Sequence, residues 1–252
     1  MNSINMAFLL TTLAGLSTML GVVPIFIKLK DENQIITASL AFAAGVMSCV
    51  SITDLIPESI LMLENYYSGF ITVVLVFLFL MIGIVVSSFI DKAFPSTPVI
   101  SNSHVSLYKV GIISMVAIIL HNLPEGIATF ISTTKDTSLG ISLAVAIALH
   151  NIPEGISISV PIYYSTKSKM KAIFYTFISA MSEPLGAILT YLFLFPFINN
   201  VVLGLLFAFI AGIMIQISLT ELIPAAQNYS YPKITKIFFI IGVIFMLVKF
   251  FM

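Results

Sequence analysis

The sequence has few charged side chains, no arginine and a single cysteine. Only 9% of its 252 residues are charged and 59% are hydrophobic, whereas soluble proteins carry roughly a quarter charged residues. This composition excludes an ordinary soluble domain and indicates an all-α integral membrane protein. Cys49 stands alone, which excludes a disulfide framework and a cysteine-based zinc fold. The net charge is zero and no basic block occurs, so nucleic acid is not an expected partner.

Long apolar runs fill most of the chain. A membrane-spanning helix needs about 20 predominantly apolar residues, and charged and turn residues divide the chain into eight such segments. We therefore predict a single transmembrane domain over residues 1–252, embedded in the lipid bilayer. Its eight helices are expected at 5–27, 35–62, 69–90, 108–133, 138–163, 171–194, 200–224 and 234–251.

Lysines are concentrated on one side of these spans. The connections that follow the odd-numbered spans hold nine lysines, whereas the other side holds only Lys135 and Lys249. In membrane proteins the excess of positive charge marks the cytoplasmic loops. We therefore predict a multi-pass protein of the cell membrane with both termini outside the cytoplasm.

Two of the predicted spans repeat one another. Residues 41–59 (AFAAGVMSCVSITDLIPES) and 208–226 (AFIAGIMIQISLTELIPAA) are identical at ten of 19 positions, at a constant offset of 167. Span two runs outward and span seven runs inward, so the copies have opposite directions, as in the inverted repeats of transporters. We predict that spans one to three and six to eight form the two halves of this repeat, around a central antiparallel pair, spans four and five.

The central pair of spans carries two near-copies of a polar motif. Residues 121–127 read HNLPEGI, and residues 150–156, 29 positions later, read HNIPEGI. Residues four apart share a helix face, so the histidine and the glutamate of each copy point the same way. Each histidine lies about half-way along its span, which places both motifs near the middle of the bilayer.

Two imidazoles and two carboxylates at this depth form a donor set that suits Zn²⁺ and tolerates other divalent first-row metals. The plainer alternative is that these polar side chains only tie helices together by hydrogen bonds. Ionisable side chains in hydrocarbon are costly and functional by default, so we favour a metal site. Its predicted ligands are His121, Glu125, His150 and Glu154.

Three further polar residues lie at the same depth. Asn122 and Asn151 follow the two histidines, and their spacing leaves two roles open, as ligands of a second ion or as hydrogen-bonding groups between helices. Glu183 lies about half-way along span six and favours the first role. Together with the motif glutamates, it would complete a second, oxygen-rich ion position.

Carboxylates also lie near the ends of the repeated spans. Asp54 and Glu221 hold equivalent positions of the repeat, near the outer end of span two and the inner end of span seven, and Glu58 follows Asp54 by one turn. Two interpretations stay open. These residues are either the mouths of a pathway that concentrates cations or ordinary solvated helix ends.

These motifs resemble those of the ZIP family of divalent-metal transporters, and most closely its bacterial ZupT branch. HNLPEG and HNIPEG on consecutive spans, followed by SEPLGA at 182–187, carry a resemblance that covers essentially the whole chain. It implies eight spans with both termini outside, uptake toward the cytoplasm, and a homodimer with an elevator-like or rocking motion. It also implies a binuclear site. One position would take the motif histidines and glutamates, and the other the motif asparagines, the shared glutamates and Glu183.

We therefore expect a transporter, not an enzyme, that imports Zn²⁺ and also Fe²⁺, Mn²⁺, Co²⁺ or Cd²⁺, with the metal as cargo and no prosthetic group. Two alternatives stay open. An intramembrane metal-dependent hydrolase would use a metal-bound water, but the sequence has no HExxH motif and its three mid-depth glutamates are all assigned as ligands. A divalent-cation channel would show non-saturating flux, whereas a carrier saturates.

Overall fold

In the described part of the computed structural model, helices cross the molecule eight times. The structure describes residues 3–27, 31–93, 107–194, 197 and 199–248. Within these ranges there is no strand, and seven helical segments are long and apolar enough to span a membrane. The eighth, α11, is described over Pro232–Leu247, and the last part of its predicted span, 249–251, lies outside the described residues. The prediction of an all-α membrane protein is confirmed.

Helix boundaries agree with the predicted spans to within a few residues. The first four spans are α1 (Ser3–Ser17) with η1 (Thr18–Phe26), α2 (Glu32–Val50) with η2 (Ser51–Leu55) and α3 (Ile56–Glu64), α4 (Gly69–Ala93), and α5 (Leu107–Lys135). The last four are α6 (Thr137–Thr166), α7 (Lys169–Ala180) with α8 (Ser182–Leu189) and η3 (Thr190–Leu194), α9 (Asn200–Ile217) with η4 (Ser218–Leu222) and α10 (Ile223–Gln227), and α11. Side-chain caps from Asp31, Asp136 and Asn199 fix where α2, α6 and α9 begin.

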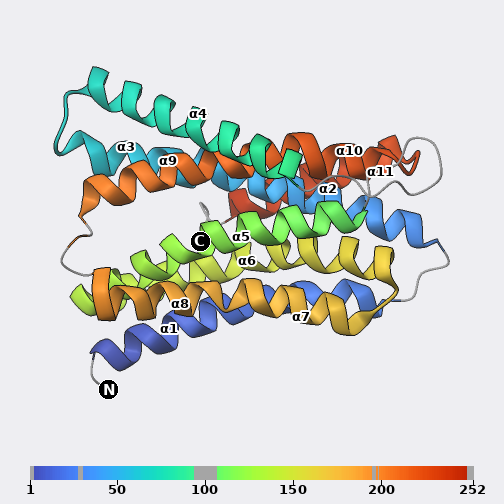
Figure 1. Cartoon of the computed structure of the whole chain (residues 1–252), viewed down its shortest axis with the longest axis horizontal. Coiled ribbons are helices and arrows are strands. Elements are labelled where there is room, and N and C mark those ends of the chain that lie inside the picture. The colour runs from blue at the N-terminus through green and yellow to red at the C-terminus, as the bar shows by residue number, and fades with distance from the viewer. Residues whose placement is uncertain (1–2, 28–30, 94–106, 195–196, 198, 249–252) are drawn as a thin grey trace.

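The helices form two layers (Figure 1). The first layer holds α2 with α3, α4, α9 with α10, and α11, and the second holds α1, α5, α6 and α7 with α8. In the first layer α2 packs against α11, and α4 packs against α9. In the second layer α5 and α6 pack against each other, α8 packs against α5, and η1 packs against α6. Each half of the predicted repeat therefore contributes helices to both layers instead of forming one of them.

The inverted repeat is visible in the packing of the first layer. A Cβ atom on Gly45 of α2 would lie 2.2 Å from the carbonyl oxygen of Phe239 on α11. A Cβ atom on Gly212 of α9 would lie 2.1 Å from the carbonyl oxygen of Leu80 on α4. Only glycine allows helices to approach this closely. The two glycines are 167 residues apart, which is the offset of the sequence repeat. The π-helical turns η2 and η4 are separated by the same 167 residues.

Candidate metal centre

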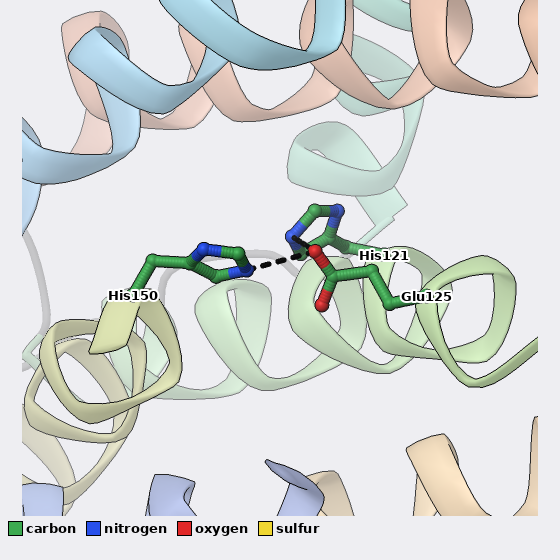
Figure 2. A group of neighbouring side chains, drawn as sticks. All are labelled: His121, Glu125 and His150. Carbon is green, nitrogen blue, oxygen red and sulfur yellow. Dashed lines mark hydrogen bonds and ion pairs between the residues drawn. The ribbon is translucent and has the colours of Figure 1, made fainter. Parts of the chain in front are cut away.

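The two motif-bearing helices, α5 and α6, run antiparallel through the middle of the second layer. Figure 2 shows His121 and Glu125 of α5 and His150 of α6 pointing toward one another. The Glu125 Oε1 atom is 2.8 Å from His150 Nε2 and 3.1 Å from His121 Nε2. Ligand atoms from the three side chains all lie within 4.8 Å of one another. One carboxylate oxygen thus lies between two imidazoles that come from different helices.

Glu154, the fourth predicted ligand, joins this cluster through the histidine of the other helix. Its Oε1 atom lies 3.3 Å from His121 Nε2. Around a tetrahedral zinc ion with bonds of about 2.0–2.1 Å, neighbouring donor atoms lie roughly 3.3 Å apart. The observed separations of 2.8–3.3 Å therefore suit a small tetrahedral cation. All four side chains are buried, with at most 6% of any residue exposed.

Several donor atoms in this region have no hydrogen-bond partner among the residues that the structure describes. They include the Oε2 atoms of Glu125 and Glu154 and both side-chain polar atoms of Asn122. A buried polar atom without a partner costs about 1–3 kcal/mol, and more if it is charged. In native proteins, most such atoms are satisfied by water or by another ligand. A cation bound by several of these oxygens and nitrogens would satisfy them together.

Glu183 of α8 lies beside the second motif. Asn151 Nδ2 donates hydrogen bonds to Glu183 Oε2 at 2.8 Å and to the carbonyl oxygen of Ala14 at 3.0 Å. Asn151 and Glu183 are both fully buried, and Glu183 is within electrostatic range of the motif glutamates. The structure therefore brings Glu183 and Asn151 together next to the histidine cluster. Within the described residues, no hydrogen bond joins Asn122 to either of them.

Glycines let α8 approach the first motif closely. A Cβ atom on Gly126 would lie 2.0 Å from the carbonyl oxygen of Glu183, and one on Gly186 would lie 2.2 Å from that of Leu123. The glycine of the HNLPEG motif and the glycine of SEPLGA thus each fit against the backbone of the other helix. This contact fixes the position from which the Glu183 side chain reaches the site.

A cavity of about 620 Å³ leads to this cluster from one face of the molecule. Asp54 and Glu58 line it, together with Lys135 at the end of α5, and Glu125 and His150 lie at its inner end. Its lining residues Lys135 and Leu139 lie where α5 ends and α6 begins. The lysine distribution predicts that this side is the outside. The predicted site is thus joined to one side of the protein by a path lined with carboxylates.

Glu221, the third predicted pathway residue, has a different environment. It lies in η4 at the position that the repeat relates to Asp54, but it is only 6% exposed and does not line this cavity. Pro57 and Pro224 follow the two turns at equivalent positions. A proline lacks the amide hydrogen and crowds the preceding turn, which favours the local widening of the helix that both turns show.

Lys135, which the sequence did not identify as a site residue, is the one lysine among the described residues that line the cavity. Its charge opposes those of Asp54 and Glu58 at the mouth and lowers the local concentration of cations. One sequence feature could have pointed to Lys135. It lies at the end of the span that carries His121, on the side of the protein that is poor in lysine.

Comparison with known proteins identifies the family. The profile of the family described as ZIP Zinc transporter matches residues 96–249. The chain belongs to the ZIP zinc transporter family. The match covers α5 to α11, so it includes both HNxPEG motifs and Glu183.

Relatives of this ZIP chain are similar over nearly its whole length. Proteins named Zinc transporter ZupT include one from Streptococcus mutans serotype c, which is 44% identical over 238 residues and 88% of each chain. The protein of that name from Clostridium perfringens is 40% identical over 99% of this chain and 96% of its own. That from Oceanobacillus iheyensis is 41% identical over 91% of each chain. The resemblance indicated by the motifs is therefore confirmed.

Proposed function

We propose that this protein imports divalent metal cations, chiefly Zn²⁺, into the cytoplasm through a site in the middle of the membrane. The observation that carries this proposal is the convergence of two histidines and two glutamates from antiparallel helices at the inner end of an open cavity. Membership of the ZIP family and the names of its relatives support zinc as the main cargo. Fe²⁺, Mn²⁺, Co²⁺ and Cd²⁺ suit related sets of nitrogen and oxygen donors.

The first ion position takes nitrogen and oxygen donors. His121 and His150 supply imidazole nitrogens, and Glu125 and Glu154 supply carboxylate oxygens. An imidazole nitrogen that binds a metal must offer its lone pair, so any proton held between a histidine and Glu125 leaves when the ion enters. The metal therefore replaces the short contact between His150 and Glu125.

The second ion position takes oxygen donors. Glu183 and the amide oxygens of Asn122 and Asn151 line it, and Glu125 and Glu154 bridge to the first position. Three carboxylates carry a charge of −3, against +4 for two divalent ions and +2 for one. A site with fewer than two ions therefore holds protons, and metal binding releases them.

Carboxylates along the path raise the concentration of cations at each side of the membrane. Asp54 and Glu58 attract ions to the open cavity, and Lys135 limits this attraction. Glu221 has the corresponding role on the cytoplasmic side, which the inverted repeat relates to the outer side.

Transport requires the site to open to each side in turn. On the side opposite the cavity, Lys167 at the end of α6 forms an ion pair of 2.5 Å with Glu32 at the start of α2, which joins the two layers. This pair is solvent-exposed and therefore weak enough to break during each cycle. We propose that the layers move relative to each other, in an elevator-like or rocking motion within a homodimer. An inward-negative potential favours import by about 2.3 kcal/mol per charge per 100 mV, and by roughly twice that for a divalent ion.

Uptake of radioactive zinc into sealed vesicles that contain the purified protein tests this proposal. The expected result is a saturable initial rate that Fe²⁺, Mn²⁺, Co²⁺ and Cd²⁺ reduce by competition. A rate that rises linearly with zinc concentration would indicate a channel instead. Absence of zinc uptake by vesicles that contain correctly folded protein would overturn the proposal.

A further inference from the structure

Two short segments of the second layer match one another. Residues 17–21 (STMLG) and 182–186 (SEPLG) share three of five residues at an offset of 165. The first segment begins where α1 ends, and the second begins where α8 starts after the break that follows α7. At this offset, Thr18 corresponds to Glu183.

Side-chain hydrogen bonds show the same correspondence. The Ser17 hydroxyl donates to the carbonyl oxygen of Ala14 at 2.6 Å. The Ser182 hydroxyl donates to the carbonyl oxygen of Ser179 at 2.5 Å. Ser182 and Ser179 lie 165 positions after Ser17 and Ala14, respectively. The local chain path is therefore repeated along with the sequence.

The two segments also contact the motif helices in equivalent ways. A Cβ atom on Gly155 of α6 would lie 1.9 Å from the carbonyl oxygen of Thr18, and one on Gly126 of α5 would lie 2.0 Å from that of Glu183. Gly126 and Gly155 are the glycines of the two HNxPEG motifs, 29 residues apart. The pseudo-twofold relation that exchanges α5 with α6 therefore exchanges Glu183 with Thr18.

This relation places Thr18 on the side of Asn122. Glu183 packs against α5 and reaches across to Asn151 of α6. By the same relation we expect Thr18, which packs against α6, to face Asn122 of α5. Thr18 and Asn122 are both fully buried. The Thr18 hydroxyl and both polar atoms of the Asn122 amide have no hydrogen-bond partner in the part of the chain that the structure describes. A threonine hydroxyl is also two bonds closer to the backbone than a glutamate carboxylate oxygen, so it reaches less far toward the opposite helix.

We infer that Thr18 supplies a neutral oxygen to the second, oxygen-rich ion position, on the Asn122 side opposite Glu183, and thereby determines selectivity among divalent cations. This inference rests on the proposed function. A threonine at this place keeps the site at three carboxylates, where a second glutamate would add a fourth. Mn²⁺ prefers oxygen donors, whereas Zn²⁺ is also held by imidazole nitrogens. Loss of the Thr18 oxygen should therefore weaken the binding of Mn²⁺ more than the binding of Zn²⁺.

The substitution Thr18→Val removes the hydroxyl and keeps the shape of the side chain. We expect Mn²⁺ affinity of the purified protein, and the ratio of Mn²⁺ to Zn²⁺ uptake in vesicles, to fall about tenfold, with a smaller fall in zinc uptake. Thr18→Ser, which keeps the hydroxyl, should retain the wild-type Mn²⁺ affinity and the wild-type uptake ratio. Thr11→Val is the matched control, because Thr11 is a buried threonine of the same span, in α1, whose hydroxyl donates a hydrogen bond to the carbonyl oxygen of Ala7. Wild-type Mn²⁺ affinity and uptake ratio in Thr18→Val would overturn the inference.

A transposed pair of substitutions tests the same inference without relying on Thr18→Val to fold. Glu183→Thr should weaken Mn²⁺ affinity, and adding Thr18→Glu should restore most of it, because the carboxylate then reaches Asn122 from the equivalent place. A double variant that folds but binds Mn²⁺ no better than Glu183→Thr alone would overturn the inference. Failure of the wild-type protein to take up zinc would instead overturn the proposed function, and the affinity measurements on purified protein separate the two outcomes.

Discussion

The two π-helical turns carry nearly the same sequence in two different environments. Residues 51–55 read SITDL and residues 218–222 read SLTEL. Asp54 in the first turn lines the cavity, whereas Glu221 in the second is 6% exposed and lies away from it. Because the local sequence and local backbone are so alike, the difference arises from how the two layers are placed. We interpret the structure as the state that is open on the side of Asp54, and its inverse would open on the side of Glu221.

Substitutions in the metal cluster should have the largest effect on zinc uptake, because an ion that enters from either side of the membrane has to reach this cluster. Glu125→Ala should reduce zinc uptake by about 100-fold or more, because a single oxygen of Glu125 contacts both histidines. Glu183→Ala should reduce zinc uptake by only about tenfold, because the ligands of the first ion position remain in place. Initial rates in vesicles measure both. Glu64→Gln, at an exposed carboxylate on the end of α3, is the control and should leave uptake unchanged.

A Glu125→Ala variant that folds and keeps more than about a tenth of wild-type uptake would contradict this ranking of the ligands. Transported zinc would then not have to pass through the cluster drawn in Figure 2.

Joining the two layers on the closed side should have the next largest effect. Glu32→Cys with Lys167→Cys, in a Cys49→Ser background, allows a bifunctional maleimide to link α2 to the end of α6. We expect transport to fall about tenfold or more once the link forms, because the closed side then cannot open. Uptake before and after cross-linking, with cross-linked protein quantified on gels, measures the effect.

The matched control links two residues within the first layer. Asp31 accepts a hydrogen bond from the Tyr231 hydroxyl, and these residues lie at the starts of α2 and α11. Linking cysteines at these two positions should leave transport nearly unchanged. Equal inhibition by both links, or none by either, would contradict movement between the layers.

Charge-neutral substitutions in the two turns should have smaller and different effects. Asp54→Asn should raise the KM for zinc supplied from outside several-fold and leave kcat unchanged, because Asp54 concentrates ions at the open mouth. Glu221→Gln should lower kcat instead, since it acts on release to the opposite side. Lys135→Gln should lower KM by about twofold. Kinetics in oriented vesicles measure these values, and identical changes for Asp54→Asn and Glu221→Gln would remove the distinction between the two turns.

The smallest effect concerns the side opposite the cavity. The hydrogen bond from the Tyr231 hydroxyl holds the pKa of Asp31 below its ordinary value. A carboxyl whose pKa is lowered by folding contributes stability above its unfolded pKa, and this contribution is lost as the pH falls through the folded value. Tyr231→Phe should therefore slightly lower the thermal midpoint at pH 6, and the difference from wild type should shrink toward pH 3. A constant difference at both pH values would contradict this origin.

The shared faces of the motif residues could be predicted from sequence because they follow from helix geometry. A spacing of four puts each histidine and glutamate on one side of its helix. The partners across the helices could not be predicted, since they depend on how α6 is rotated about its axis. In the structure Glu154 contacts His121 of α5, and no contact with its own neighbour His150 is seen within the described residues.

The inverted repeat was only partly visible in the sequence. Spans two and seven share ten of 19 residues, which an alignment can detect, whereas residues 17–21 and 182–186 share only three of five. Their equivalence, and with it the place of Thr18, appears only when hydrogen bonds and backbone contacts are compared. The side on which the cavity opens depends on the relative position of the layers and has no local signal.

The initial rate of zinc uptake into vesicles shows whether zinc passes through the paired histidine and glutamate site. It is measured for wild type and for the double variant His121→Ala/Glu125→Ala, over a range of external zinc concentrations. We predict a saturable rate for wild type. For the variant we predict a rate no greater than that of protein-free vesicles, although it folds and inserts normally. Wild-type flux in the double variant would contradict transport through the paired histidine and glutamate site.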